Sequence, residues 1–412
     1  MLTGAILSFA AQATCAARTI RVARGGAVPS IAAALRLAAP GDDIVIAAGR
    51  YEEGGLEVLC RVTIRGEGNP MVAARGRGGV FIVRANGVSI RDLAVGETGR
   101  SDIEDRAAIK LVGVRDCIIE RVTVRDAFFG LYLSKCARCT IRDCVLTRRA
   151  TNESSSGNGI HSWSGDSLLI ENNRIEGHRD GIYLEFTKHT SVIGNTSIGN
   201  VRYGLHFMFS DDDTYERNVF TRNGSGVAVM YTHRVHMRGN VFSRNWGGAA
   251  YGLLLKEITD SEIEDNLFEG NTTGLYAEGG ARILVRDNVF RGNGWAVRLM
   301  ANCTDNTFTR NAFLRNTFDV STNSTSSSSA FRENHWEAYR GYDLDRDGIG
   351  DVPYRPVRVF SYIVAKNPPA IVLLNSFIVG LLDVTERVLP TITPVALSDA
   401  RPLMKPPRGR RP

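Results

Sequence analysis

The chain has 412 residues, of which 43% are hydrophobic and 23% charged, and its formal net charge is +6. The positive charges are spread along the chain, without the basic runs and interleaved aromatic residues typical of nucleic-acid-binding proteins. We therefore expect no nucleic-acid partner.

The first segment, residues 1–17, reads MLTGAILSFAAQATCAA, a short apolar core followed by small residues. This pattern is typical of the last part of a secretory signal peptide, although the usual basic residues at the start are missing. We predict export with cleavage near Ala17, and a strand that is not a signal is the alternative. Cleavage there would remove Cys15.

Residues 18–57 are predicted to form an N-terminal cap. Ser30 can cap a helix over the run IAAALRLA, which ends before Pro40 and Gly41. A repeat array needs such a cap, because its first coil would otherwise expose core and unpaired strand edges. Residues 58–95 then supply the first, irregular coils of the array.

From residue 181 to residue 316 one sequence unit recurs. The glycines Gly181, Gly204, Gly226, Gly252 and Gly274 are separated by 23, 22, 26 and 22 residues. An independent asparagine marker has steps of 23, 22, 26, 22, 23 and 23, at Asn195, Asn218, Asn240, Asn266, Asn288, Asn311 and Asn334. Two markers in one register indicate a repeat protein.

Within each unit, short β-branched or aromatic runs alternate with Gly, Asn and Asp turns, and no segment keeps helical spacing. The frame of a leucine-rich repeat is absent. We therefore predict an all-β fold, a right-handed parallel β-helix over residues 58–340 with one coil per repeat. Equivalent positions of successive coils would lie about 4.8 Å apart, directly above one another.

This stacking lets the sequence be interpreted as columns. The recurrent asparagine should form a ladder of side-chain amides. Two places later we predict an apolar core column with Ser197 as its polar gap, formed by Val145, Ile175, Phe220, Phe242, Phe268, Phe290, Phe313 and Trp336. After each glycine, the first and third residues should point inward, and the second and fourth outward.

The outward pairs are unusual for a solvated surface. They are His161 and Trp163, Tyr183 and Glu185, His206 and Met208, Ala228 and Met230, Leu254 and Lys256, Tyr276 and Glu278, and Arg298 and Met300. Aromatic, imidazole and thioether groups on a rigid sheet indicate a binding surface. Two insertions, residues 149–158 and 246–249, lengthen coils and are expected to frame these columns.

Four cysteines, Cys117, Cys136, Cys139 and Cys144, cluster in the early coils. Cys117 and Cys139 are 22 residues apart, so they could face each other about 5 Å apart on adjacent coils. Three interpretations remain open at this point: small buried hydrophobes, a disulfide, and a thiolate metal site on Cys136 and Cys139.

Residues 341–412 form the C-terminal part, which opens with GYDLDRDGIGDVPY. Asp343, Asp345, Asp347 and Asp351 stand at positions 1, 3, 5 and 9 of a calcium-loop pattern. Gly348 stands at position 6, and Ile349 would offer its carbonyl oxygen. The twelfth position is Tyr354 rather than Glu, so a plain Asp-rich turn is the alternative to a calcium site.

The run AIVLLNSFIVGLLDVTERVL, residues 370–389, could form a helix of about 30 Å. Its uninterrupted apolar piece is too short to span a bilayer. It would either cap the last coil or form an apolar arm that lies against a membrane protein or the bilayer interface.

Several long segments resemble one family. YGLHFMFSDDDTYERN, GVAVMYTHRVHMRGNVF, NWGGAAYGLLLKEITDSEIEDN, GYDLDRDGIGDVPYRPV and ARPLMKP are similar to NosD, the periplasmic maturation proteins of nitrous-oxide reductase, an enzyme of denitrification. The resemblance covers residues 18–406 approximately. The four clustered cysteines and the weak signal segment depart from it.

The resemblance implies a β-helix of the carbohydrate-binding and sugar-hydrolase type in the periplasm, attached peripherally to the inner membrane. It implies docking on an ABC transporter with a membrane subunit and an ATPase, without catalysis by this chain itself. It also implies that the protein receives Cu(I) from a lipoprotein chaperone and helps to load copper into the reductase. The C-terminal apolar arm would contact the membrane subunit.

The residues agree with a soft metal, because Cu(I) binds thioethers, thiolates and imidazoles. Met208 and Met230 each stand fourth after their glycine and are 22 residues apart, so they should stack, and His206 should point the same way as Met208. We interpret His206, Met208 and Met230 as Cu(I) ligand candidates, with His161 and Glu185 extending the face. Surface residues without a metal are the alternative, and His233 and His236 are interpreted as turn residues or secondary contacts.

Two other function classes remain. One is a polysaccharide lyase or epimerase, for which His161, Tyr183, Glu185, His206 and Tyr276 could serve. Neither the Asp-Pro-His motif of alginate epimerases nor a cluster of arginines is found in the sequence. The other is a structural adaptor that recruits the reductase without binding metal.

Overall fold

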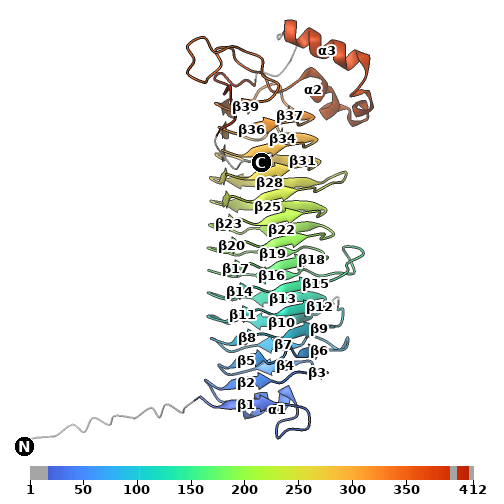
Figure 1. Cartoon of the computed structure of the whole chain (residues 1–412), viewed down its shortest axis with the longest axis vertical. Helices are drawn as coiled ribbons and strands as arrows, with labels where there is room; N and C mark the ends of the chain where they lie inside the picture. Colours follow the sequence, from blue (N-terminus) through green and yellow to red (C-terminus); the bar gives the residue numbers. More distant parts are fainter. Residues whose placement is uncertain (1–16, 102, 390–396, 408–412) are drawn as a thin grey trace, which may run out of the picture.

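The computed structural model describes residues 17–101, 103–389 and 397–407. The predicted signal peptide lies outside the described residues, apart from Ala17. The chain winds into a long right-handed parallel β-helix, and Figure 1 shows its coils stacked from the N-terminal to the C-terminal end. The predicted fold class is confirmed.

Three parallel sheets of 14, 13 and 12 strands run along the column, and each complete coil contributes one strand to each. The first sheet contains β1 (Thr19–Val22), β2 (Asp43–Ile46), β5 (Thr63–Gly66), β8 (Ser89–Arg91), β11 (Ile118–Glu120), β14 (Thr140–Arg142), β17 (Leu169–Glu171), β20 (Ser191–Ile193), β23 (Thr214–Glu216), β26 (His236–Arg238), β29 (Glu262–Glu264), β32 (Leu284–Arg286), β35 (Thr307–Thr309) and β38 (Ala330–Arg332).

The second sheet contains β3 (Arg50–Tyr51), β6 (Met71–Ala73), β9 (Ala94–Gly96), β12 (Thr123–Arg125), β15 (Val145–Thr147), β18 (Arg174–Glu176), β21 (Thr196–Ile198), β24 (Val219–Thr221), β27 (Val241–Ser243), β30 (Leu267–Glu269), β33 (Val289–Arg291), β36 (Ala312–Leu314) and β39 (His335–Trp336).

The third sheet contains β4 (Leu56–Val58), β7 (Phe81–Val83), β10 (Ala107–Val112), β13 (Phe129–Ser134), β16 (Ile160–Trp163), β19 (Ile182–Glu185), β22 (Tyr203–Met208), β25 (Ser225–His233), β28 (Tyr251–Thr259), β31 (Thr273–Glu278), β34 (Trp295–Leu299) and β37 (Phe318–Thr322). This sheet carries the outward pairs.

The aromatic core column forms as expected. The rings of Phe242 and Phe268 stack with centroids 4.7 Å apart, and those of Phe313 and Trp336 with centroids 4.1 Å apart. At the polar gap, the Ser197 hydroxyl donates to the Gly204 carbonyl at 2.7 Å. The expectation for Val145 was wrong: it is 38% exposed, and Leu146 occupies the column in register with Ile175.

Two asparagine ladders run through the coils. In the predicted one, each amide nitrogen donates to the amide oxygen of the next coil, as from Asn195 Nδ2 to Asn218 Oδ1 at 3.0 Å. A second ladder, not predicted, includes the bond from Asn200 Nδ2 to Asn223 Oδ1 at 2.9 Å. His178 holds the position before Asn200 in this second ladder, where its backbone N–H donates to Asn200 Oδ1.

The six cysteines in the described part of the chain are free thiols. Cys117, Cys136, Cys139 and Cys144 are each about 1% exposed and lie in the hydrophobic core. Cys144 stands at the asparagine rung of its coil, because its backbone N–H donates to Asn173 Oδ1 at 3.0 Å. Burial raises the pKa of Cys144 to about 12, so this thiol stays protonated. The structure corresponds to the first of the three interpretations, small buried hydrophobes.

At the N-terminal end, α1 (Ile31–Leu37) lies against the first coil. The Ser30 hydroxyl accepts from the backbone N–H of Ala33 at 3.1 Å, as the capping pattern predicts. Residues 18–57 also contain β1 to β3 and most of β4, which already belong to the three sheets.

The C-terminal arm consists of α2 (Val359–Lys366), the 3-10 helix η1 (Pro368–Leu373) and α3 (Phe377–Val388). The expectation of one continuous helix over residues 370–389 was wrong. Ser376 begins a new helix by accepting from the backbone N–H of Val379, so α3 is only about 18 Å long. None of the helices in the described ranges has both the length and the apolar character needed to cross a bilayer.

A returning segment closes the last coil. The Asp399 carboxylate lies where the next rung of the first ladder would be and is fully buried. It accepts from Asn334 Nδ2 at 3.1 Å and from Trp336 Nε1 at 3.0 Å. The backbone N–H and Nδ2 of Asn334, which both donate to Asp399, are the groups that a further asparagine rung would have satisfied.

Candidate functional site

The site lies on the outer surface of the third sheet, along β16, β19, β22 and β25. Strand register sets its geometry, because equivalent residues of neighbouring coils are paired one to one. Close packing fixes that register: a Cβ at Gly204 would lie 2.6 Å from the Gly226 carbonyl oxygen, too close for any side chain. The glycine marker of the sequence therefore holds adjacent coils in contact.

Glu185, Met208 and Met230 form one column on three successive coils. Glu185 pairs with Met208, and Met208 with Met230. The three side chains are partly exposed. His206 lies two residues before Met208 on the same face of β22. The structure therefore brings four of the five Cu(I) candidates together.

His206 is far less exposed than an outward position suggests, with 6% of its surface accessible. Its ring stacks on Tyr183 at 4.6 Å and lies 4.9 Å from the ring of Tyr203. Burial lowers the pKa of His206 to about 4, so the imidazole is neutral at pH 7. Its Nε2 atom is buried and has no hydrogen-bond partner among the described residues.

His161, the fifth candidate, stands apart from the methionines. It belongs to the column of Tyr183 and His206, two coils from His206, with the Tyr183 ring between them at 4.8 Å. The insertion at residues 149–158 reaches it, since Asn158 Nδ2 lies 3.1 Å from His161 Nδ1. Arg179 Nε donates to Asn158 Oδ1, which directs the amide nitrogen toward the imidazole. Burial lowers the pKa of His161 to about 4.

Tyr183 connects these groups and was not among the predicted ligands. Its ring lies between His161 and His206, and its hydroxyl donates to Met208 Sδ at 3.7 Å. Burial raises the pKa of Tyr183 to about 12, so the phenol keeps its proton at neutral pH. The outward pattern contained Tyr183, but only the register shows that its hydroxyl reaches a thioether.

An exposed aromatic ladder, formed by Phe186, Phe209 and Tyr231, borders the column. These residues directly follow Glu185, Met208 and Met230, and they are 48%, 41% and 38% exposed. Their rings stack nearly parallel, 5.2 and 5.1 Å apart, so the rings cover one another's faces and leave mainly their edges outward.

The backbone at this turn makes the aromatic ladder costly. Phe186, Phe209 and Tyr231 have φ values of 53°, 51° and 54°, a left-handed conformation that disfavours bulky side chains by roughly 1–2 kcal/mol each. The same turn position in other coils holds Gly113, Lys135, Ser164, Glu257 and Gly279. The aromatic ladder is visible in the sequence one residue after the outward pairs, at Phe186, Phe209 and Tyr231.

The second insertion, residues 246–249, also lies beside the third sheet. The carbonyl oxygen of Ala249 accepts from the Ser225 hydroxyl at 3.2 Å, and Trp246 is 62% exposed. Among the nearby histidines, His233 bonds to Thr259 Oγ1 at 2.7 Å and His236 lies 3.6 Å from Glu262. Both are exposed and neither belongs to the column: His233 is the last residue of β25, and His236 is the first residue of β26 in the first sheet.

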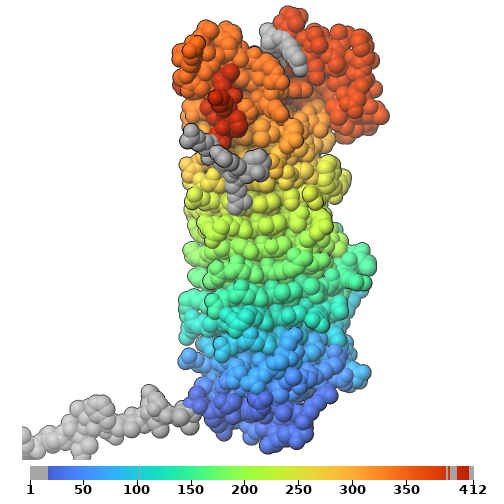
Figure 2. Space-filling view, viewed as in Figure 1, coloured from blue at the N-terminus to red at the C-terminus, as the bar shows by residue number. Residues whose placement is uncertain are grey.

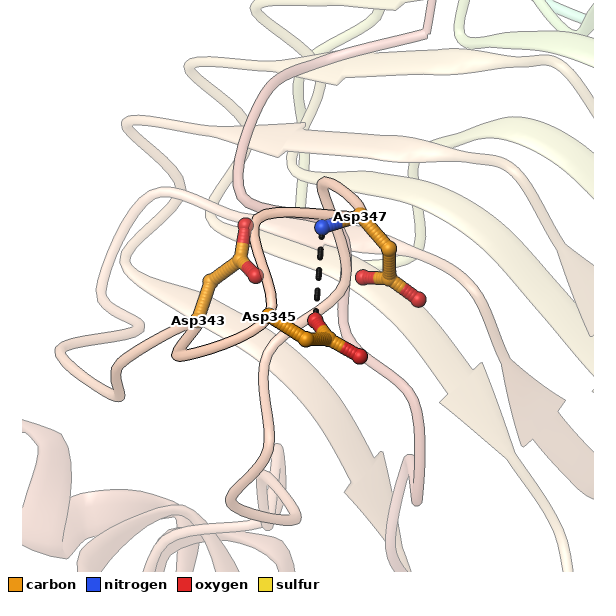
Figure 3. Close-up of side chains that lie close together, drawn as sticks. All are labelled: Asp343, Asp345 and Asp347. Carbon is orange, nitrogen blue, oxygen red and sulfur yellow. Dashed lines mark hydrogen bonds between the residues drawn. The ribbon is translucent and has the colours of Figure 1, made fainter.

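A separate cluster of carboxylates lies near the C-terminal end. Figure 3 shows Asp343, Asp345 and Asp347 around one loop, and one ligand atom of each lies within 4.8 Å of the others. Loop N–H groups organise it: Gly348 N donates to Asp343 and Ile349 N to Asp347. Asp351 instead accepts from Leu344 N at 2.7 Å.

Comparison with known proteins identifies relatives. The sequence profile of the family described as "Periplasmic copper-binding protein (NosD)" matches residues 146–343. A "Probable ABC transporter binding protein NosD" of Pseudomonas aeruginosa is 28% identical over 386 residues, covering 88% of each chain. The protein of the same name from Stutzerimonas stutzeri is 34% identical over 76 residues, 18% of this chain and 17% of that one.

Two solved structures with a similar fold are a glucanase and an exopolygalacturonase. The catalytic domain of a GH87 alpha-1,3-glucanase in complex with tetrasaccharides has a TM-score of 0.58 at 15% identity, covering 76% of this chain and 66% of that one. A family 28 exopolygalacturonase of Yersinia enterocolitica has a TM-score of 0.54 at 11% identity, covering 76% and 77%. At such identities the likeness shows the fold alone.

Proposed function

The chain belongs to the NosD family, and from this we propose that it is a periplasmic accessory protein that receives or passes Cu(I) during copper-site assembly of nitrous-oxide reductase. The family description supports copper binding in the periplasm. The name of the Pseudomonas aeruginosa relative supports binding to an ABC transporter. In this proposal the chain is not catalytic, and the ATPase is a partner subunit.

One observation carries the proposal: two thioethers, Met208 and Met230, are in register on adjacent coils, with the imidazole of His206 beside them. These donors suit Cu(I), which prefers soft and imidazole ligands. The orphaned Nε2 atom of His206 fits a metal, since a buried polar atom without a partner costs about 1–3 kcal/mol. Copper is the cargo of this site.

Neutral donors suit a cargo site for a further reason. A thiolate site releases protons when it takes up metal, whereas thioethers carry no proton to release. His206 is already neutral at periplasmic pH, because burial lowers its pKa to about 4. Uptake and release of Cu(I) therefore need not compete with protons at pH 7.

Two surfaces support the proposed partners. The aromatic ladder offers ring edges next to the thioether column, and such edges favour contact with aliphatic or thioether side chains. It suits the copper-chaperone lipoprotein or the reductase, each of which must approach the copper. The arm carries the second surface, with Phe377 84%, Ile378 68% and Leu381 55% exposed. We assign this apolar surface to the membrane subunit of the transporter, which would attach the protein to the inner membrane.

Competition with a chromophoric Cu(I) chelator tests the copper role. We expect the purified full chain to take Cu(I) from bathocuproine disulfonate, and the double variant His206→Ala/Met208→Ala to bind at least about 100-fold more weakly, since it loses two of three ligands. Met300→Ala is the matched control, because Met300 is a partly exposed methionine further along the outward side of the third sheet. Maturation of the reductase in cells should fail with the double variant and persist with the control.

The alternatives predict different results. A metal-free adaptor would leave the chelator undisturbed, and the double variant would still support maturation. A polysaccharide lyase or epimerase would turn over alginate or pectin, and the variant His206→Ala would lose that turnover. Either result would contradict the proposed function.

We further propose that the Asp343, Asp345 and Asp347 cluster holds Ca²⁺, with the Ile349 carbonyl and Asp351 as the remaining loop ligands. Oxygen donors at this spacing suit calcium. The loop is fixed to the returning C-terminal segment, since Gly350 N donates to the Pro402 carbonyl and Met404 N to the Gly348 carbonyl. Calcium would therefore stabilise the C-terminal end of the β-helix and would not affect the copper site.

A further inference from the structure

Next to His206 lies an ion pair between Asp180 and the half-buried Arg202, which the proposed ligand set does not use. The Asp180 side chain is fully buried. Arg202 grips it with two bonds, Nε to Oδ1 at 2.9 Å and Nη2 to Oδ2 at 2.5 Å, and the backbone N–H of Tyr203 donates to Oδ1 at 3.2 Å. A bidentate, backbone-supported carboxylate of this kind is held rigidly.

This pair lies against one nitrogen of His206. Arg202 Nη2 is 3.4 Å from His206 Nδ1, and Asp180 Oδ2 is 3.9 Å from the same atom. A guanidinium can only donate, so Nδ1 accepts in this state and the neutral imidazole carries its proton on Nε2. That proton points to no partner among the described residues, although its nitrogen is buried.

Copper binding through Nε2 requires the other tautomer. The proton must then reside on Nδ1, where the nearest acceptor is Asp180 Oδ2. Metal-bound histidines almost always donate their second N–H to a carboxylate, a carbonyl or water, which fixes the ring and strengthens the ligand. The 3.9 Å separation between Nδ1 and Oδ2 must shorten to hydrogen-bond distance when copper binds.

Resting on the proposed function, we propose that Asp180, held by Arg202, is the positioning residue that accepts a hydrogen bond from Nδ1–H of His206 when Nε2 binds Cu(I). The exchange is balanced: the proton lost from Nε2 is matched by one gained on Nδ1, no bond to carbon changes and copper stays Cu(I). The pair would therefore orient the imidazole from its Nδ1 side and leave Nε2 for Cu(I).

A double-mutant cycle on the full chain tests this role with Cu(I) and bathocuproine disulfonate. Asp180→Asn should weaken Cu(I) binding 10- to 100-fold, the usual cost of losing such a partner. In a His206→Ala background the same substitution should change the affinity by less than about twofold, because its effect passes through the imidazole. The matched control is Asp213→Asn, a buried aspartate that accepts from Thr190 N and Thr187 Oγ1 and should leave the affinity unchanged.

Nitrogen-15 NMR of wild-type protein with labelled histidines reports the tautomer of His206 directly. This measurement does not depend on whether a variant folds. His206 should be the Nε2–H tautomer without copper and the Nδ1–H tautomer with one equivalent of Cu(I). The inference is overturned if the tautomer does not change, or if Asp180→Asn weakens binding equally with and without His206. If the wild type binds Cu(I) and His206→Ala weakens that binding but Asp180→Asn does not, the role of Asp180 is wrong while the proposed function stands. If the wild type binds no Cu(I), both are wrong.

Discussion

At the residue scale, the molecule places polar side chains where burial changes their chemistry. His161, His178 and His206 are all buried near the first insertion, and burial lowers the pKa of each. His178 is the extreme case, with both ring nitrogens lacking a partner among the described residues and a pKa lowered to about 3. It occupies a rung that asparagine fills in the later coils.

His178→Asn should therefore reduce acid sensitivity. Histidine in the unfolded chain has a pKa of about 6.5. Between pH 6.5 and 3 the unfolded chain therefore binds a proton at this residue that the folded protein does not bind, so the stability of the wild type falls as pH falls. Relative to wild type, the variant should gain about 3 kcal/mol in unfolding free energy between pH 7 and pH 4. Urea unfolding at several pH values measures this difference, with exposed His233→Asn as the control. Parallel pH curves for wild type and His178→Asn would contradict it.

The residue columns could be predicted from the sequence. Alternation along a strand fixes the direction in which each side chain points, and the fixed repeat length fixes its neighbours on adjacent coils. The phenylalanine column and the first asparagine ladder follow from that alone. The burial of His161 and His206 could not be predicted from the direction in which their side chains point. It depends on the ring of Tyr183 and on the insertion that contacts His161 through Asn158. Leu146 rather than Val145 enters the column, because Cys144 takes the asparagine rung of that coil.

At the element scale, the ends of the column depart most from the sequence expectations. The repeat stops near β39, and the chain closes the last coil with Asp399 instead of another asparagine. The arm breaks at Ser376 because a short-range cap competes with a continuous helix, which hydrophobicity alone does not reveal. The Asp-rich loop was recognisable from its spacing, but its contact with residues 402–404 was not.

Calcium should stabilise this end of the molecule. At a concentration 100 times the dissociation constant, a ligand that binds only the folded state adds about 2.7 kcal/mol. We expect Ca²⁺, and not Mg²⁺, to raise the Tm and to slow amide exchange over residues 397–404, with both effects lost in Asp345→Asn. The exposed turn variant Asp305→Asn should respond like wild type. Equal Tm values in Ca²⁺ and in EGTA would exclude a calcium site.

At the scale of the whole molecule, the two proposed contact surfaces are well separated. The thioether column ends on β25, whereas the arm packs on β37, four coils further and therefore about 19 Å along the axis. Figure 2 shows the arm as a lobe that projects beside the C-terminal end of the column. A partner bound to the arm would therefore leave the thioether column open to a second partner.

Because the two surfaces are well separated, we expect that a substitution can abolish one contact and leave the other intact. Phe377→Glu/Leu381→Glu should abolish binding to the membrane subunit in detergent, because it places charges on an apolar surface that the partner must bury. Cu(I) affinity and Tm should remain unchanged, since both side chains are more than half exposed. Leu59→Glu, at an exposed leucine near the N-terminal end, is the control. Unchanged binding of the double variant would show that the partner attaches elsewhere.

X-ray absorption at the copper edge, on the full chain carrying one equivalent of Cu(I), tests the copper site most directly. We expect a first shell of two sulfur atoms and one imidazole nitrogen. One sulfur should disappear in Met230→Ala, and the imidazole signal should disappear in His206→Ala. A shell without sulfur, or a spectrum that Met208→Ala and Met230→Ala leave unaltered, would contradict the assignment of copper to this face.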